Sequence, residues 1–276
     1  MKEHTLISKN KKIVVSVSGG VDSLTLAETL HRLQYSIELL HFNHGTRTEE
    51  NSKEEKLVGE FANSRGLNLH TVYLKMSLDE KNFEKKARLL RQKTYKSFIE
   101  NNYWVYTAHH IDDSFEWSLM QSFKQGSLEH SLGIPVFNNG IVRPFMCATK
   151  KHIQKYARIS KLSWFEDSSN KNLKFERNYL RAVISAKILE KYPKALAHYV
   201  AQSNEKLKII KLNKESNTIE IRKEKWGVLL ISSELGAHKE EIKNQIAKLS
   251  NKDRGLLSHE VDKLVSTHQE IKSHPE

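Results

Sequence analysis

A glycine- and serine-rich stretch near the N-terminus contains the residue types of a phosphate-binding turn. Gly19 and Gly20 lack Cβ atoms, so an anion can approach their backbone amides directly. Ser18 and Ser23 add hydroxyl donors beside these amides. Asp22 would repel a phosphate unless a divalent cation lay between them, so it predicts Mg²⁺ bound together with a nucleotide. The predicted phosphate cradle comprises Ser18, Gly19, Gly20, Val21, Asp22 and Ser23.

The spacing of this stretch excludes two common nucleotide-binding loops. It contains neither the G-x-x-x-x-G-K-[ST] pattern nor the G-x-G-x-x-G pattern of dinucleotide-binding folds. A simpler interpretation stays open, in which Asp22 and Ser23 only cap a helix that follows a glycine turn.

Histidine and carboxylate side chains gather in a second stretch, directly after another apolar run. Asp113 and Glu116 lie three residues apart in a predicted helix, so they share one face of it. The stretch supplies five candidate ligands: His109, His110, Asp112, Asp113 and Glu116.

Three interpretations of this second stretch stay open. Its residue types are those of a transition-metal site. In the interpretation that we favour, Asp22 and either Asp112 or Asp113 hold Mg²⁺ on the nucleotide, the remaining carboxylates bind an ammonium group, and His109 contacts phosphate. In the third interpretation, one of the two aspartates caps the helix.

Basic side chains form three further groups that suit an anionic ligand. His44 lies in a loop after the second predicted strand, and Arg88 and Arg91 lie three residues apart on a predicted helix. Arg177 and Arg181 end a polar loop in which aromatic and basic residues alternate, a composition that suits a splayed-out base and its phosphate. The alternatives are hydrogen-bonded loop structure for His44, surface solvation for Arg88 and Arg91, and an ordinary loop for Arg177 and Arg181.

The elements that must position these residues follow from the apolar pattern. Short β-rich runs cover residues 13–17, 37–42, 69–74, 104–108 and 141–145. Helical periodicity covers residues 24–33, 53–64, 83–99 and 149–160, with another helix beginning near residue 113. This alternation predicts a parallel twisted sheet with helices on both faces. Ligands bind at the carboxyl ends of strands in such sheets, where both chemical stretches lie.

The composition predicts a globular chain with two domains. The 276 residues are 38% hydrophobic and 28% charged. Beyond Pro193, lysine and glutamate alternate with isolated apolar residues. We therefore expect a catalytic domain over residues 1–195 and a smaller, mainly helical domain over residues 196–276 that contacts nucleic acid.

Charge and cysteine content narrow the functional classes. The net charge of +12 favours a polyanionic partner such as nucleic acid, although a lysine-rich solvated surface is the alternative. Cys147 is the sole cysteine, which excludes an intramolecular disulfide and a cysteine-based zinc site. No apolar run reaches the roughly 20 residues that cross a bilayer, so we expect a cytoplasmic protein without membrane contact.

The S-G-G-x-D-S string of residues 18–23 resembles the loop of the N-type ATP pyrophosphatases, which cleave ATP to AMP and pyrophosphate. Further strings resemble one branch of that superfamily, the tRNA(Ile)-lysidine synthetases, which join free lysine to an anticodon cytidine. These strings are His41–Arg47, Asn82–Arg91, Ala108–Glu116, Arg143–Phe145 and Trp164–Arg181. The chain departs from the family pattern at Gln92 and at Lys124–Ser127, where the family has an R-G-S-G turn.

The resemblance implies an adenine nucleotide alpha hydrolase-like fold, with ATP and Mg²⁺ as cofactors. The cytidine O2 would be adenylated, pyrophosphate would leave, and the lysine amine would displace AMP at C2. The cradle would hold pyrophosphate, and Asp22 and Asp112 would hold Mg²⁺. The implied partners are free lysine and the anticodon loop of tRNA, and a homodimer stays open.

The resemblance also implies individual roles for the charged residues. His109 and Arg181 would stabilise charge that builds on the phosphates, and Asp113 and Glu116 would orient lysine. Base or phosphate contacts would come from His44, Arg88, Arg91 and Arg177.

Two alternatives to this function stay open. A diverged relative would keep the adenylation site but use another nucleophile or acceptor, which the changed segment Lys124–Ser127 favours. A catalytically idle RNA-binding relative would keep the fold without the reaction, but the intact acidic and histidine residues argue against it.

Overall fold

A computed structural model describes residues 10–43, 45, 48–74, 83–124, 131–166, 172–173, 175–216, 220–224 and 227–231. The chain divides into two compact units, Met1–Ser203 and Asn204–Glu276. The predicted sheet and the residues proposed to do chemistry lie in the first unit.

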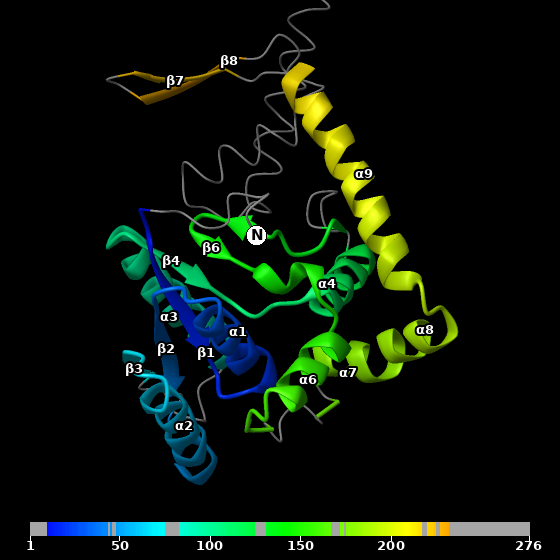
Figure 1. Cartoon of the computed structure of the whole chain (residues 1–276). Coiled ribbons are helices and arrows are strands. Elements are labelled where there is room, and N and C mark those ends of the chain that lie inside the picture. Colours follow the sequence, from blue (N-terminus) through cyan, green and yellow to red (C-terminus); the bar gives the residue numbers. More distant parts are fainter. Residues whose placement is uncertain are drawn as a thin grey trace, which may run out of the picture. The chain divides into compact units, whose positions relative to one another are not determined.

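The first unit is built on a six-stranded sheet with the strand order β3-β2-β1-β4-β6-β5 (Figure 1). Strands β3, β2, β1, β4 and β6 are mutually parallel, whereas β5 pairs with β6 in the antiparallel direction. The predicted parallel sheet is confirmed, and β5 adds an antiparallel edge that the apolar pattern did not indicate. The strands are β1 Lys12–Val17, β2 Ile37–Asn43, β3 Leu69–Tyr73, β4 Tyr103–Tyr106, β5 Phe137–Asn138 and β6 Ile141–Val142.

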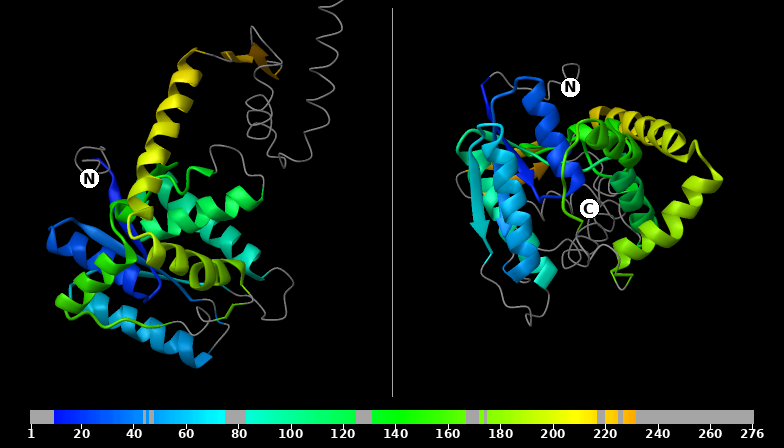
Figure 2. Two further views of the ribbon diagram at one scale, coloured as in Figure 1. Left: turned by 90° about the vertical axis from the view of Figure 1, so that its right-hand side faces the viewer. Right: turned by 60° about the horizontal axis from the view of Figure 1, so that its bottom comes forward.

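Helices alternate with these strands and cover both faces of the sheet (Figures 1 and 2). The helices are α1 Val21–Arg32, α2 Thr48–Asn63, α3 Phe83–Glu100, α4 Ile111–Phe123, α6 Lys150–Ile159, α7 Glu176–Tyr179, α8 Ala186–Lys191 and α9 Ala195–Ser216. A 3₁₀ turn, Pro144–Cys147, follows β6, and a π-helical segment, Leu180–Ser185, joins α7 to α8. The predicted fifth strand is therefore shorter than expected, ending at Val142 just before Pro144, whose ring removes a backbone donor.

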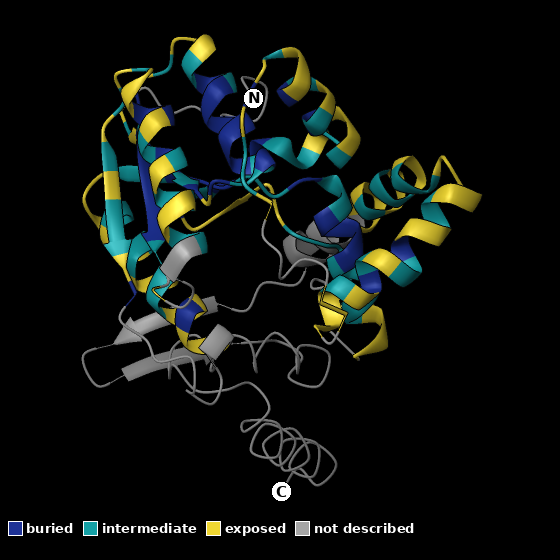
Figure 3. Cartoon of the chain, turned by 90° about the horizontal axis from the view of Figure 1, so that it is seen from below, coloured by how far each residue is buried: buried dark blue, intermediate teal, exposed yellow. Residues whose placement is uncertain are grey.

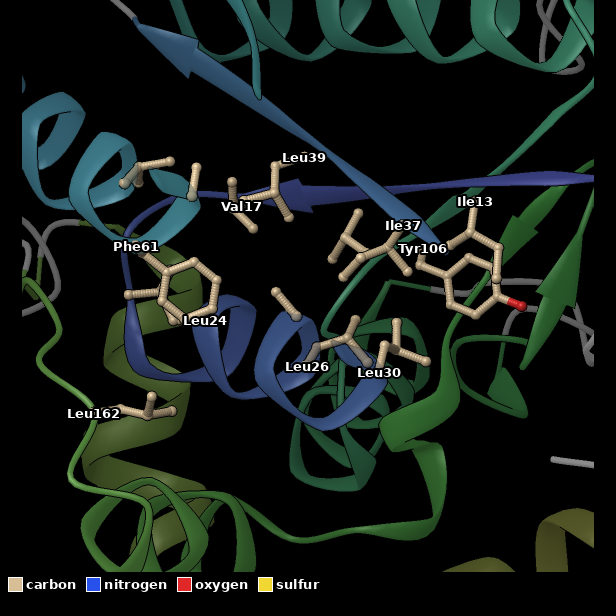
Figure 4. Close-up of a cluster of buried hydrophobic side chains, with 14 of the residues drawn as sticks. Ile13, Val17, Leu24, Leu26, Leu30, Ile37, Leu39, Phe61, Tyr106 and Leu162 are labelled. Atoms are coloured by element: carbon tan, nitrogen blue, oxygen red, sulfur yellow. The ribbon is translucent and has the colours of Figure 1, made fainter. Parts of the chain in front are cut away.

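The strand residues alternate between two buried clusters. Val15 and Val17 of β1 pack in one cluster with residues of α1, α2 and α6, whereas Val14 packs in the other with Ala87 of α3. Figure 4 shows Leu24 of α1 in the first cluster, and Figure 3 shows the buried strands and inner helix faces in dark blue. This period of two confirms that helices cover both faces of a buried parallel sheet.

The parallel pairing brings the carboxyl ends of the central strands to one edge. Val17 at the end of β1 pairs with His41 of β2, and Val15 pairs with Tyr106 at the end of β4. The segments that follow β1 and β4 therefore leave the sheet side by side, and these segments carry the cradle and the acidic stretch.

The second unit contains the end of α9 and two paired strands, among the residues that the structure describes. Strands β7 (Glu220–Glu224) and β8 (Gly227–Ile231) form an antiparallel pair that the sequence did not predict. Within the described ranges, no helix is both long and apolar enough to span a bilayer.

Candidate active site

The predicted phosphate cradle forms the turn between β1 and α1. Gly19 has a φ of +75°, and a Cβ atom there would lie 2.9 Å from Cγ of Glu54 on α2. The Ser18 amide donates to Ser23 Oγ at 3.1 Å, and this hydroxyl donates to the Gly20 carbonyl at 3.0 Å. The turn is therefore closed by its own side chains, at the positive end of the α1 dipole, where an anion is favoured.

A segment distant in sequence supports the cradle from outside. The amide of Phe165 donates to the Gly19 carbonyl at 2.9 Å. The neighbouring Trp164 packs against the hydrophobic cluster beside α1. The segment after α6 therefore fixes the direction of the Gly19 peptide, a role that the sequence did not reveal.

The first turn of α4 gathers the acidic residues around a buried histidine. The His110 amide donates to Asp113 Oδ2 at 3.0 Å, so Asp113 caps α4, as one of the three interpretations predicted. The His110 ring lies between two carboxylates, with Nδ1 3.3 Å from Asp112 and Nε2 3.4 Å from Asp113. His110 is only 3% exposed, so this ring separates the two aspartates inside the protein.

Two arginines bind the far side of the acidic group. Arg181 donates from Nε to Glu116 Oε1 at 2.8 Å and from Nη2 to Oε2 at 2.9 Å. Its Nη2 is also 3.1 Å from Asp113 Oδ1, which accepts a second bond from Arg177 Nη2 at 2.7 Å. Asp113 and Glu116 therefore share one face of α4, as predicted, and that face is occupied by guanidinium groups.

These contacts keep the two aspartates ionised. Burial opposes ionisation of Asp113, but the charges of His110 and Arg177 hold its pKa below the ordinary value. Burial also opposes ionisation of Asp112, and the nearby His110 ring and the hydrogen bond from the Lys150 amide hold its pKa low. The site therefore presents stable negative charge to a cation.

His109 is in the opposite situation. Burial outweighs the attraction of Asp113 and lowers the pKa of His109 to about 4. Its Nδ1 is 3.0 Å from Thr107 Oγ1. His109 is therefore neutral near pH 7 and can act there as a hydrogen-bond donor, whereas the role predicted for it was charge stabilisation.

The carboxylate of Asp22 already has a cationic partner. Lys150 Nζ, from the first turn of α6, lies 2.7 Å from Asp22 Oδ1 and 2.6 Å from Oδ2. The backbone amide of the same lysine donates to Asp112 Oδ2 at 2.9 Å. Lys150 therefore links the cradle to the acidic group on α4.

Asp22 of the cradle, three residues of α4 or its cap (His110, Asp112 and Glu116), Lys150 and Arg181 line one cavity of about 230 Å³. His109, Asp113 and Arg177 are not among its lining residues. Phe115, Ala186 and Leu189 add apolar lining, and Ser185 Oγ is buried without a hydrogen-bond partner among the described residues. The lining residues are Asp22, His110, Asp112, Phe115, Glu116, Lys150, Arg181, Ser185, Ala186 and Leu189. Asp22 of the predicted cradle and the predicted carboxylates Asp112 and Glu116 thus line the same space.

A π-helical segment supplies one wall of the cavity. The helical segments from α7 to α8 follow each other without a break (Figure 2), and Arg181, Ser185 and Leu189 recur along them at intervals of four. The wider π turn keeps residues four apart facing one direction, and π turns are frequent at functional sites. The four-residue spacing of these lining residues could have been noticed in the sequence, but no sequence pattern indicates the π turn itself.

Several predicted residues lie outside the cavity or outside the described part of the chain. Arg88 is exposed and Arg91 is half-buried on α3, and neither lines the cavity. His44 and the segment 167–171 lie outside the described residues. His41, before this loop, is buried with Nδ1 3.0 Å from the Val17 carbonyl, and burial lowers its pKa, as expected of a structural histidine.

The sequence did not indicate Lys150 as a functional residue. The first turn of α6 carries no acidic residue, and it begins with Lys150 after the Thr149 cap. Cations are disfavoured at helix N-termini, so a lysine at this position was an available signal of an anionic partner. Its partner Asp22 is 128 residues away, which no local pattern reveals.

The donor set at the cradle fits Mg²⁺ that is bound together with phosphate. Mg²⁺ in nucleotide sites takes one or two carboxylates and completes its shell with phosphate and water oxygens. Asp22 and Asp112 are carboxylates of this kind and share the cavity. Within the described ranges no group of three or more His, Cys, Asp or Glu side chains is arranged so that it could hold a metal ion by itself.

Comparison with known proteins agrees with this geometry. The family model described as a PP-loop domain matches residues 1–188. The tRNA(Ile)-lysidine synthase of Enterococcus faecalis is 29% identical over 214 residues, covering 74% of this chain and 46% of the relative. The enzyme of the same name from Streptococcus pyogenes serotype M3 is 34% identical over 192 residues, covering 66% of this chain and 42% of the relative. The chain thus spans less than half the length of these relatives.

A solved structure shares the fold at low sequence identity. The U34-tRNA thiolase NcsA from Methanococcus maripaludis superposes with a TM-score of 0.59 at 16% identity, covering 73% of this chain and 74% of that chain. The likeness supports the sheet topology described above. With its glycine turn, its strand order and the match over residues 1–188, the chain belongs to the PP-loop family.

Proposed function

We propose that this chain attaches lysine to C2 of the wobble cytidine of tRNA(Ile), using ATP and releasing AMP and pyrophosphate. The observation that carries the proposal is that Asp22 of the cradle and Glu116 of the carboxylate pair line one cavity. A nucleotide and an amine can therefore meet there. Relatives named tRNA(Ile)-lysidine synthase support this choice of substrates.

The cradle forms the ATP side of the proposed site. Amides and hydroxyls of Ser18, Gly20 and Ser23 would exchange the bonds that close the turn for bonds to the leaving pyrophosphate. Asp22 and Asp112 would hold Mg²⁺, which neutralises phosphate charge when bound. His109, neutral at pH 7, donates a hydrogen bond rather than a full charge to a phosphate oxygen.

The carboxylates of α4 form the amine side. Arg177 binds Asp113 and Arg181 binds Glu116 in the structure, so these carboxylates already have cationic partners. The substrate ammonium would take over part of these contacts, and Arg181 would then turn toward phosphate. Leu189 and the apolar wall beside it suit the methylene stem of lysine.

The RNA side is proposed from charge. The excess of basic residues suits a polyanion. Arg177, His44, Arg88 and Arg91 are proposed to contact the anticodon loop. Residues 1–195 would form the catalytic domain and residues 196–276 would add further tRNA contacts, in the cytoplasm.

The test is mass analysis of the anticodon nucleosides after incubation with ATP, Mg²⁺, lysine and a tRNA(Ile) transcript. A cytidine that gains the mass of lysine minus water is the expected result. Replacement of Asp113 with Asn should abolish this product, whereas replacement of the exposed Lys151 with Gln should not change it. Unmodified cytidine under all conditions would contradict the proposal.

A second candidate function is adenylation of another acceptor or use of another nucleophile. It is favoured by Lys124, which begins the altered segment and pairs with Glu176 on α7. Exchange of labelled pyrophosphate into ATP, measured with different RNAs and with lysine or ammonia, separates the two candidates. Exchange that depends on tRNA(Ile), with an adenylated intermediate that is consumed by lysine and not by ammonia, supports the first candidate.

A further inference from the structure

Lys150 forms an ion pair with Asp22, the acidic residue of the phosphate cradle. Its Nζ contacts both carboxylate oxygens of Asp22, at 2.7 and 2.6 Å. Asp22 lies in the first turn of α1, two residues after Gly20 of the cradle. An anion that enters the cradle therefore approaches the lysine ammonium and the aspartate together.

The structure fixes the backbone of Lys150 and leaves its side chain adjustable. The amide is held by Asp112 Oδ2 at 2.9 Å, and the Thr149 side chain caps α6. The Lys150 side chain is 37% exposed and lines the cavity. A lysine stem has four rotatable methylenes, so Nζ can move while the backbone stays in place.

The helix position of Lys150 is unfavourable without an anionic partner. It is the first residue of α6, and the positive end of a helix dipole repels a cation. The same helix end attracts phosphate. A phosphate between the cradle and α6 would therefore be attracted by two helix N-termini and by the ammonium group.

We propose that Lys150 is a phosphate-binding residue, which exchanges Asp22 for the β- and γ-phosphates when the nucleotide binds. This inference rests on the proposed ATP-using function and adds a residue that neither the family match nor the relatives assign. After the exchange, the positively charged Lys150 ammonium group lies against the departing pyrophosphate. It also frees both oxygens of Asp22, which then become available to Mg²⁺.

A purely structural role would also explain the ion pair. In that role Lys150 only neutralises Asp22 and never contacts the ligand. The two roles differ in what happens when Asp22 loses its charge. In Asp22→Asn no carboxylate is left for Lys150 to neutralise, so a purely structural Lys150 would no longer matter. A Lys150 that contacts phosphate would still contribute to ligand binding in this variant.

The first experiment titrates ATP and AMP into the full chain by calorimetry, with Mg²⁺ present. Lys150→Gln should weaken ATP binding about 10- to 100-fold, the effect of one charge-assisted hydrogen bond, and leave AMP binding within about twofold. Lys151→Gln, one residue further along the same helix and exposed, is the matched control and should bind both ligands like the wild type. Lys150→Arg should retain most of the ATP affinity, and circular dichroism checks that each variant is folded.

The second experiment separates contact from neutralisation. Binding of inorganic pyrophosphate is measured by thermal shift in EDTA, where Asp22 has no metal to hold. Asp22→Asn should bind pyrophosphate at least as well as the wild type, and Lys150→Gln in the Asp22→Asn background should bind it about tenfold less well than Asp22→Asn. Equal binding by these two variants would overturn the proposal.

The outcomes distinguish this inference from the proposed function. A wild-type chain that binds neither ATP nor pyrophosphate overturns both. Normal ATP binding by the Lys150→Gln variant overturns only the proposed role of Lys150. The same holds if the wild type binds pyrophosphate only when Mg²⁺ is present. Formation of the lysine-modified cytidine by the wild type would still support the proposed function.

Discussion

Arg181 holds both carboxylate oxygens of Glu116, with Nε 2.8 Å from Oε1 and Nη2 2.9 Å from Oε2. Glu116 is only 3% exposed, whereas the Arg181 side chain is 43% exposed. Within this pair the carboxylate is buried, whereas the guanidinium group is partly exposed to solvent. Loss of the arginine would leave a buried carboxylate with the weaker contact from Arg177 at 3.6 Å.

The first prediction concerns the stability of this pair. Arg181→Met should lower the free energy of unfolding by about 2–4 kcal/mol, because the buried Glu116 carboxyl loses its main partner. The double variant Arg181→Met with Glu116→Gln should recover most of this loss. Urea denaturation of the wild type, both single variants and the double variant gives the coupling energy. A double variant as unstable as the sum of the singles would contradict the prediction.

The second prediction concerns competition between arginine and the substrate amine. If lysine binds Asp113 and Glu116, removal of the Arg181 guanidinium should open that position. Millimolar lysine should then raise the melting temperature of Arg181→Met by several degrees and that of the wild type by less. Nε-acetyl-lysine, which keeps the α-ammonium group but lacks the side-chain ammonium charge, is the control ligand and should have no effect. Equal responses of both proteins to both ligands would exclude this competition.

The third prediction concerns pH. The pKa of His109 is about 4 in the folded chain, against about 6.5 for an unfolded histidine. Its contribution to stability is complete above pH 6.5 and is lost as the pH falls toward 4, because the unfolded chain binds the proton first. Relative to His109→Gln, the wild type should therefore lose about 2 kcal/mol between pH 7.5 and pH 4.5. Denaturation curves that shift in parallel for both proteins over this range would show that His109 is not responsible.

The fourth prediction concerns a glycine that packs α4 against α9. Gly133 has a φ of +99°, and a Cβ atom there would overlap the Tyr199 hydroxyl and Ser114 Oγ. Gly133→Ala should lower the free energy of unfolding by about 2–5 kcal/mol, through overlap and backbone strain together. Gly59→Ala is the matched control, because a Cβ atom on that α2 glycine meets nothing within 4 Å and should stabilise the helix by about 0.5–1 kcal/mol. Thermal and urea unfolding of the two alanine variants would show opposite shifts.

The sequence predicted the sheet and the meeting of its functional segments, for a simple physical reason. Parallel strands point their carboxyl ends in one direction, so residues that follow β1 and β4 must leave at one edge. This placed Asp22 and Glu116 at one site before any coordinates were known. Apolar runs of five or more residues were long enough to predict β1 to β4 and the start of β6, whereas β5 consists of two exposed residues and carries no period.

The pairing of charges inside the site could not be predicted in the same way. Arg181 was assigned to phosphate, but in the structure it pairs with Glu116, 65 residues away. Lys150 and Asp22 are farther apart still in the chain. Such contacts depend on how the α7–α8 segment and α6 dock against α4 and α1, and docking is set by side-chain packing across the whole unit rather than by local periodicity. The proposed phosphate roles of Arg88 and Arg91 stay predictions.

The internal ion pairs also separate two ranges of electrostatic force. Asp22, Asp113 and Glu116 are matched by Lys150, Arg177 and Arg181, so the +12 excess of the chain lies elsewhere. Under the proposed function, long-distance attraction of the tRNA would then belong to the outer surface, where salt screens it within about 8 Å at physiological ionic strength. Glu116 in the cavity is buried, so its short-range contact with a small substrate would be screened less. Capture of the tRNA and binding of the small substrate would thus differ in their dependence on the ionic composition of the cell.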